Sequence, residues 1–288
     1  TKAGKTYYSL TLQDKTGTAD GKIWELNNGI ANFEPMDYIH CEGMVTSFQG
    51  NLQMNISRVR ISDEGEYDPA DYVPCTNKDV GEMFSRILKY VASVQNKYLR
   101  KILEMYFVEN KEFVDAFKKH SAAKSVHHGF MGGLLEHTLS VTDMCQYFAE
   151  HYPMIHRDLL ITAALFHDMG KIQEISDFPM NDYTDDGQLL GHIYIGARCM
   201  ENAAAQIPNF PPKLKNELVH CILAHHGKME FGSPKVPAIM EAMALHMADN
   251  ADAKLQTLTE VFTQAGDNMG WLGFNRMFES NLRKTSEE

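Results

Sequence analysis

The pattern of hydrophobic and polar positions changes once along the chain. Within residues 6–61, short runs carry apolar side chains at every second position, for example Tyr8, Leu10 and Leu12. This alternation is typical of half-buried strands. Turn sequences at residues 14–17 and 49–51 interrupt the alternating runs. We therefore predict four strands in this part of the chain.

Further along, the apolar residues take the spacing of helices. Val80, Met83, Phe84 and Ile87 follow the i, i+3, i+4 pattern of one helix face. The same spacing recurs in eight later segments: 98–107, 111–119, 132–150, 157–168, 189–206, 213–226, 236–252 and 254–264. The stretch between the two patterns carries acids, two prolines and a glycine, a composition typical of a linker. The sequence thus predicts a β domain (1–63), a linker (64–76) and a helical domain (77–288).

Composition narrows the class of protein. The chain has 288 residues, 44% of them hydrophobic, and we find no run of 18 apolar residues and no signal segment, so we expect no membrane span. The five cysteines are scattered without a CxxC pair, which favours a reducing cytoplasm over a disulfide framework. The formal charge of −11 makes the surface a poor non-specific ligand for duplex DNA, but does not exclude a nucleic acid in a local channel.

Histidine and aspartate clusters in the helical part suggest metal chemistry. The chain has 13 histidines, and several lie in short motifs on different predicted helices or at their ends. In chain order, the candidates are His137, His167, Asp168, His192, His225, His226 and Asp249. Apolar neighbours place position 167 on a buried helix face, where imidazoles and carboxylates are costly unless a partner compensates them. A divalent metal would compensate them together, and mixed nitrogen and oxygen ligands suit Mn, Fe, Co, Ni or Zn better than Mg.

The order of these residues resembles the HD superfamily of metal-dependent phosphohydrolases, named for its His-Asp doublet. The resemblance implies that His137, His167, Asp168 and Asp249 bind one metal. It also implies that His192, His225 and His226 hold a second one, bridged by Asp168. Lys171, in HDMGK, would contact the scissile phosphate.

A closer resemblance is to the YhaM-type 3′→5′ exoribonucleases. It rests on LTLQDKTGTADGKIW in the β part and on HHGFMGGLLEHT, FHDMGK, LLGHI and AHHGKMEFGSPKVP in the helical part. This family implies an N-terminal OB-like β-barrel followed by an all-α HD domain. Four strands would leave the barrel without its first strand, which we expect upstream of Thr1.

The same resemblance implies a function. The protein would release nucleoside 5′-monophosphates from the 3′ end of single-stranded RNA, or of single-stranded DNA, with two divalent ions, Mn²⁺ or Co²⁺ foremost. The barrel would hold the strand, with Trp24 and Lys22 as the best surface pair because they share a strand face. The resemblance also places the pair His127 and His128 near the active site. Lys228 and Phe231 would form a wall of the pocket.

Two other classes of function stay open at this point. One is an HD-type phosphodiesterase that acts on small or cyclic nucleotides, against which the presence of a barrel argues. The other is a single-strand-binding protein without activity, against which the full set of candidate ligands argues. The acidic exterior would also suit a homo-oligomer whose basic or metal-lined faces point inward.

Overall fold

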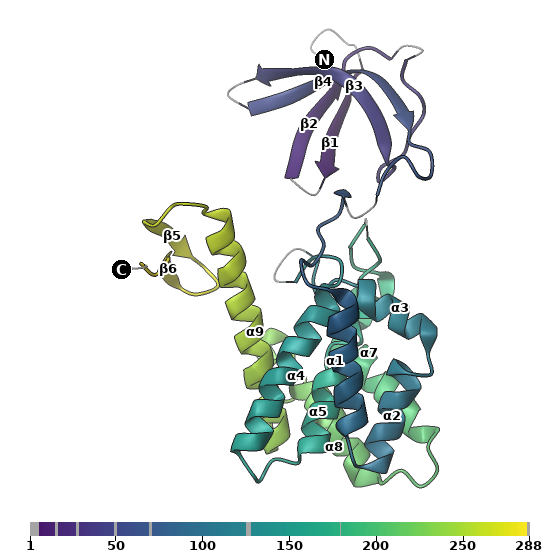
Figure 1. The fold of residues 1–288 in the computed structure, drawn as a ribbon, viewed down its shortest axis with the longest axis vertical. Helices are drawn as coiled ribbons and strands as arrows, with labels where there is room; N and C mark the ends of the chain where they lie inside the picture. Colours follow the sequence, from purple (N-terminus) through teal and green to yellow (C-terminus); the bar gives the residue numbers. More distant parts are fainter. Residues whose placement is uncertain are drawn as a thin grey trace. The chain divides into compact units, whose positions relative to one another are not determined.

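The computed structural model describes residues 6–14, 17–26, 29–48, 51–68, 71–124, 128–178 and 180–286. The chain forms two compact units, one built from residues 1–75 together with 177–180 and one from residues 76–176 and 181–288. Each has its own hydrophobic core. Figure 1 shows strands in the first unit and mainly helices in the second.

The first unit is a four-stranded sheet, as the alternating pattern predicts. Its strands are β1 (Tyr8–Asp14), β2 (Gly17–Ile23), β3 (Ile39–Phe48) and β4 (Asn51–Ile61). The strand order is β1-β2-β4-β3, with β2 and β4 parallel and the other pairs antiparallel. Ile23, Ile56 and Val59 form the centre of its small core. This arrangement is consistent with part of an OB-like barrel.

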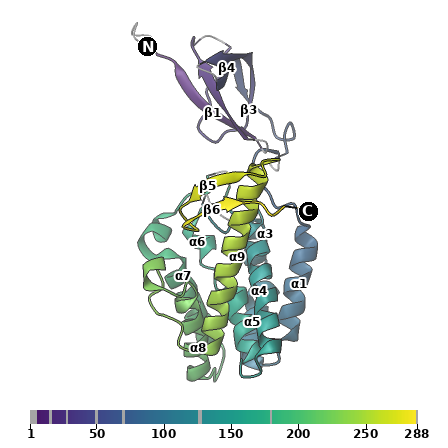
Figure 2. The same cartoon turned by 90° about the vertical axis from the view of Figure 1, so that its left-hand side faces the viewer.

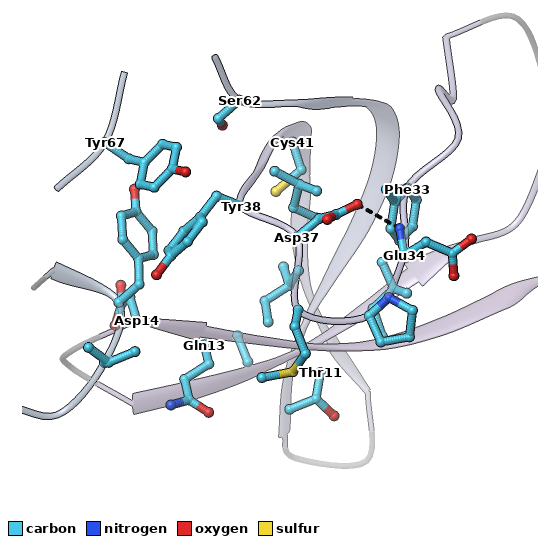
Figure 3. A pocket seen from close by; sticks show the side chains of 18 of the residues that line it. Thr11, Gln13, Asp14, Phe33, Glu34, Asp37, Tyr38, Cys41, Ser62 and Tyr67 are labelled. Carbon is cyan, nitrogen blue, oxygen red and sulfur yellow. Dashed lines mark hydrogen bonds between the residues drawn. The ribbon is translucent and has the colours of Figure 1, made fainter. Parts of the chain in front are cut away.

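A cavity of about 730 Å³ opens within this unit (Figure 3). Strand β1 and the segment from Phe33 to Ile39 line it, together with the aromatic rings of Tyr38, Tyr67 and Tyr72. Its lining residues include the carboxylates of Asp14, Glu34 and Asp37 but, among the residues that the structure describes, no histidine, lysine or arginine. An acidic cavity of this kind is poorly suited to bind the phosphate groups of a nucleic acid.

The second unit is a bundle of helices. Within its described residues the helices are α1 (Val80–Ser93), α2 (Lys97–Phe107), α3 (Lys111–Lys119), α4 (Gly133–His151), α5 (Arg157–Phe166), α6 (Lys171–Glu174), α7 (Asp185–Ala205), α8 (Pro212–Ala224) and α9 (Met240–Gln264). Side chains cap several of them: Asn96 accepts hydrogen bonds from backbone amides of α2, and Thr184 does the same for α7. Such caps define where the helical pattern begins.

Helices α4 and α5 form the centre of the bundle. Every residue of α5 from Leu159 to Phe166 is buried, and α4 packs against both α5 and α9. A helix that is buried on all sides has no face where polar groups can reach water. Polar groups at this depth, such as His137 and Thr142, therefore require specific partners.

Two features at the C-terminal end differ from the predicted pattern. The segments predicted as separate helices, 236–252 and 254–264, merge into the single helix α9, which begins only at Met240 and has no break near residue 253. A hairpin that the sequence pattern did not predict follows it, made of β5 (Trp271–Asn275) and β6 (Ser280–Arg283). In Figure 1 the hairpin and the last turns of α9 project away from the other helices, and Figure 2 shows the hairpin next to the C-terminal end of α9.

The described part of the chain contains no helix that is both long and apolar enough to span a membrane. None of the five cysteines, all of which lie in described segments, forms a disulfide.

Candidate metal centre

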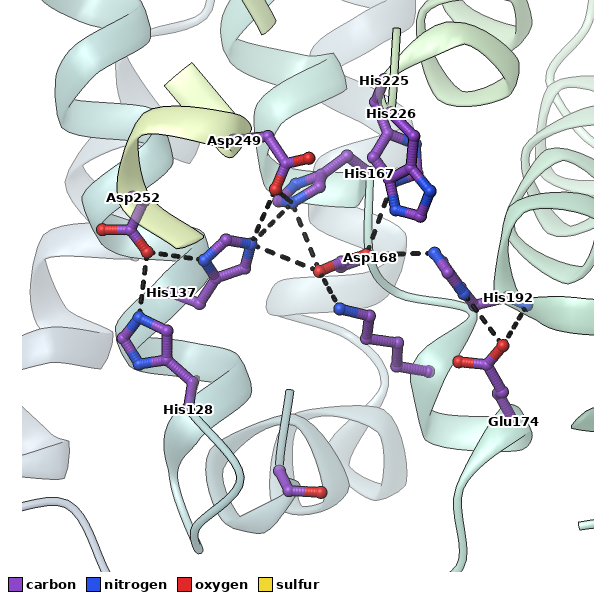
Figure 4. Close-up of polar contacts among 12 residues, drawn as sticks. His128, His137, His167, Asp168, Glu174, His192, His225, His226, Asp249 and Asp252 are labelled. Carbon is purple, nitrogen blue, oxygen red and sulfur yellow. Dashed lines mark hydrogen bonds and ion pairs between the residues drawn. The ribbon is translucent and has the colours of Figure 1, made fainter. Parts of the chain in front are cut away.

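Three side chains from separate helices meet in the interior of the bundle. His137 comes from α4, His167 from the end of α5 and Asp249 from α9. The Nε2 atoms of the two histidines lie 3.2 Å apart, and Oδ1 of Asp249 lies 3.2 Å from Nε2 of His137. These ligand atoms point to one place (Figure 4). We call these three residues the first trio.

A second trio lies beside the first. His192 belongs to α7, and His225 and His226 follow the last residue of α8. Each offers a ring nitrogen to a common point. The rings of His225 and His226 are 4.3 Å apart between centroids, and the ring of His192 lies 5.1 Å from that of His226.

Asp168 stands between the two trios. Its Oδ2 atom lies 3.3 Å from Nε2 of His137 and 3.4 Å from Nε2 of His167. Its Oδ1 atom lies 3.6 Å from Nε2 of both His192 and His225. One carboxylate thus turns one oxygen toward each trio, as a bridging ligand would.

The arrangement of these side chains suits the binding of divalent ions better than hydrogen bonding among the side chains themselves. The Nε2 atoms of His192 and His225 and Oδ1 of Asp168 are buried without a hydrogen-bond partner, a costly arrangement for polar atoms. Two nitrogens bound to one ion at about 2.1 Å each would lie about 3–3.4 Å apart, which matches the pair from His137 and His167. The donor set of five imidazoles and two carboxylates is one that transition metals favour.

Three of the histidines, His167, His225 and His226, donate their other ring nitrogen to a backbone carbonyl oxygen, which fixes the tautomer. Nδ1 of His167 donates to the Ala164 carbonyl oxygen at 2.7 Å, and Nδ1 of His225 donates to that of Ile222 at the same distance. Nδ1 of His226 donates to the carbonyl oxygen of Phe231 at 2.8 Å. A proton on Nδ1 leaves the lone pair on Nε2, so each ring presents a metal-binding nitrogen to the centre.

Carboxylates hold the two remaining histidines. Asp252 Oδ2 lies 2.7 Å from Nδ1 of His137, and Glu174 Oε1 lies 2.9 Å from Nδ1 of His192. Sequence reasoning missed both acids. Asp252 follows Asp249 by three residues on one helix face, which is a usable signal, but Glu174 belongs to no motif that we recognised.

Burial and neighbouring charges set the protonation of these groups. Burial alone would lower the pKa of His137, but hydrogen bonds with Asp168, Asp249 and Asp252 raise it well above 6.5. Burial and the adjacent His225 lower the pKa of His226 to about 4. Burial would raise the pKa of Asp168, but Lys171 and the histidines around it keep that pKa well below its usual value. The carboxylate is therefore ionised, as a metal ligand must be.

Glycines allow the helices to approach at this centre. A Cβ atom on Gly170 would lie 2.1 Å from the carbonyl oxygen of His192, so only glycine permits the turn after Asp168 to touch α7 there. Gly191 has a φ of 73°, in the left-handed region, and it interrupts α7 directly before His192. The backbone of α7 therefore changes direction directly before the candidate ligand His192.

Of the predicted substrate contacts, Lys171 lies closest to the centre. Its Nζ atom is 2.7 Å from Oδ2 of Asp168. His128 is buried, and its Nε2 atom lies 2.9 Å from Oδ2 of Asp252, so it contacts the carboxylate behind the first trio. His127, the other member of the predicted pair, lies outside the described residues.

The predicted pocket wall is tied to the second trio through its backbone. Phe231, in the short 3₁₀ helix η2 (Met229–Phe231), is exposed, and its carbonyl oxygen accepts the hydrogen bond from His226. Lys228 is also exposed, pairs with Glu230 at 3.1 Å and lies 5.3 Å from the centre of the Phe231 ring. The loop therefore presents an aromatic ring and a cation next to a candidate ligand.

The predicted strand-binding pair lies in the β unit. Trp24 is half exposed, stacks on Tyr7 with 4.9 Å between ring centroids and donates a hydrogen bond to Asn55. Asn55 is opposite Lys22 in the register of β2 and β4, so the structure brings Trp24 and Lys22 to one face. Lys22, however, is paired with Asp20 at 2.6 Å. Trp24 is the more available of the two.

The fold and the centre define the class of the helical unit. Residues 134–254 match the HD domain family, and this segment contains all seven candidate ligands. The second unit is thus an HD domain.

Comparison with curated proteins extends the match to most of the chain. Three relatives carry the name 3′-5′ exoribonuclease YhaM. The Geobacillus sp. (strain WCH70) protein is 32% identical over 88% of this chain and 78% of its own length. The Bacillus subtilis (strain 168) protein is 32% identical, over 88% and 81% respectively, and the Listeria innocua protein is 33% identical, over 90% and 82%. The chain belongs to the YhaM family of 3′-5′ exoribonucleases. No solved structure matched it.

Proposed function

We propose that this protein is a metal-dependent 3′→5′ exoribonuclease that removes nucleoside 5′-monophosphates from single-stranded RNA. The observation that carries the proposal is Asp168, whose two oxygens face two separate trios of ligands. The names of the relatives support the substrate and the direction of degradation.

Residues of the chain have distinct tasks in this reaction. The first trio, the second trio and Asp168 would hold two divalent ions, with Mn²⁺ as our choice and Co²⁺, Fe, Ni or Zn compatible with the ligands. Such a pair of ions supplies Lewis-acid chemistry that activates water and stabilises charge on the phosphate. Lys171 adds a positive charge beside Asp168, suited to an oxygen of the scissile phosphate.

The β unit would supply affinity for the strand. Exposed aromatic rings bind single strands by stacking on bases, without reading their sequence. Trp24, with one ring face on Tyr7, offers such a platform. Phe231 beside the second trio would stack on the terminal base.

A time course on a labelled strand tests the proposal. We would incubate a 5′-labelled single-stranded RNA of about 20 nucleotides with the protein and Mn²⁺, next to a DNA strand of the same sequence. EDTA and Asp168→Ala serve as controls. We expect a ladder that shortens from the 3′ end, and the loss of several orders of magnitude in rate with either control.

Other outcomes would change the assignment. An RNA that stays intact while a cyclic or short nucleotide is hydrolysed would favour a small-nucleotide phosphodiesterase. A strand that is bound but never cut with any divalent metal would favour a binding protein. Asp168→Ala with more than a tenth of wild-type activity would contradict the role of Asp168.

We also propose a reducing compartment, the cytoplasm, as the site of action. The five cysteines support this because none of them is in a disulfide.

A further inference from the structure

The five histidines of the centre are held in two different ways. His167 and His225 each donate Nδ1 to the carbonyl oxygen three residues earlier, and His226 donates to that of Phe231. Backbone acceptors of this kind persist whatever side chains surround them. His137 and His192 depend instead on side chains, Asp252 and Glu174. Each trio contains one such histidine.

Asp252 contacts the first trio through Nδ1 of His137, the ring nitrogen that does not face the other two members. It lies one helical turn after Asp249 on α9, so the ligand and the supporting carboxylate share a helix face. Its Oδ2 atom faces both His137, at 2.7 Å, and His128, at 2.9 Å. Its Oδ1 atom accepts a hydrogen bond from Ser140 on α4. Three donors thus fix the carboxylate, and the carboxylate in turn fixes the ring of His137.

Glu174 has the same relation to the second trio. Oε1 accepts from both the backbone amide of His192, at 3.0 Å, and its ring Nδ1, at 2.9 Å. The residue is buried at the end of α6, where its own carbonyl oxygen accepts from the amide of Thr184. Glu174 therefore sets both the backbone and the ring of His192, with no contact to the first trio among the contacts of the described residues.

We infer that Asp252 and Glu174 are positioning residues that each control the affinity of one metal site, so that the two ions can be weakened separately. This inference rests on the two-ion centre proposed above. A carboxylate behind a histidine ligand orients the ring and raises its basicity, and loss of such a group typically lowers metal affinity about 10–100-fold.

Titration of the metal-free protein with Mn²⁺ tests the inference. Asp252→Ala and Glu174→Ala are compared by calorimetry and by the metal content after dialysis. Anomalous scattering from crystals with limiting Mn²⁺ then shows which trio is filled. We expect both ions in the wild type, about 10–100-fold weaker binding at the first trio in Asp252→Ala, and the same loss at the second trio in Glu174→Ala.

Matched variants distinguish a role of each carboxylate in orienting its histidine ring from the general effect of changing a buried acid. Asp252→Asn and Glu174→Gln restore an acceptor for the ring and should recover part of the affinity. Glu241→Gln alters a buried carboxylate that accepts from the backbone of His156 instead, and it should leave both sites unchanged. Thermal unfolding checks each variant, and Asp252→Asn and Glu174→Gln carry the comparison where an alanine variant fails to fold.

The outcomes that overturn the inference are distinct. Equal weakening of both sites in each variant, or no weakening in either, would refute it while the two-ion centre stands. A single ion in the wild type, with retained cleavage, would refute the two-ion centre and this inference together.

Discussion

Asp168 joins the two halves of the centre. Its carboxylate is buried and lies close to four imidazole nitrogens and one ammonium group. Its negative charge therefore interacts with groups from both trios and with Lys171. In the proposed two-metal centre, a neutral side chain at this position would leave the two trios without a common ligand. Asp168 would thus link the two metal sites.

The proton on His137 should report metal binding. In the metal-free protein, hydrogen bonds with three carboxylates raise the pKa of His137 well above 6.5, which favours the protonated ring, whereas His226, with a pKa of about 4, is neutral at pH 7. Metal at the first trio must displace the proton from His137, and its apparent affinity should rise with pH until His137 is deprotonated.

Calorimetry at pH 7 in buffers of different ionisation enthalpy measures this release. We expect the observed enthalpy to depend on the buffer, with about one proton released at the first trio. Titration of EDTA with the same metal in the same buffers is the control. An enthalpy of protein binding that shows no release of a proton would contradict the assigned state of His137.

At the scale of elements, the candidate centre forms where turns bring the ends of several helices together.

Most helices were predictable from the sequence. Helices α2 and α3, for example, begin at capping residues and place their apolar residues on one face. The hairpin was not predictable, since Gly273 interrupts its first short strand and the rings of Trp271 and Phe274 stay exposed. Similarly, the candidate ligands lie in recognisable motifs. The contacts of Asp252 and Glu174 with His137 and His192 are visible only in the folded chain, although the spacing of Asp252 from Asp249 is a usable sequence signal.

Gly170→Ala tests whether close approach places His192. The added Cβ would overlap with the backbone of α7, so we expect about 1–3 kcal/mol lower stability. Displacement of His192 from Asp168 should also reduce activity by up to about 100-fold. Denaturant unfolding and the rate of RNA shortening measure the two effects.

Gly196→Ala, in the helix α7 that Gly170 approaches, is the matched control. Its added Cβ would meet its neighbours at 3.5 Å or more, an ordinary contact, and alanine favours helices. We expect near wild-type stability and activity. Equal damage in both variants would mean that α7 tolerates no added methyl group, and that the close contact at Gly170 has no special role.

At the scale of the whole molecule, we expect the β unit to bind the strand and the HD domain to carry the chemistry. The cavity of the β unit is acidic and contains none of the seven candidate ligands, all of which lie in the helical unit. The sequence motifs pointed to these candidate ligands. They could not show that Lys22 is paired with Asp20, because that contact depends on the orientation of two side chains on β2.

Trp24→Ala tests this division of labour. Loss of one stacking platform should weaken binding of a long single strand by about 1–3 kcal/mol, with little effect on hydrolysis of a dinucleotide. Fluorescence anisotropy and product analysis measure the two. Trp271→Ala, which removes the other tryptophan of the chain, is the control. Equal losses on long and short substrates would argue against a strand-binding role for the β unit.

The most direct test of the account is to locate the metal ions. A crystal structure of the protein soaked with Mn²⁺, with anomalous data, would show them independently of activity. We predict two peaks about 3.5–4 Å apart, one at the first trio and one at the second, with one oxygen of Asp168 on each. A single peak, or an Asp168 that contacts only one of two ions, would contradict the bridged two-metal centre.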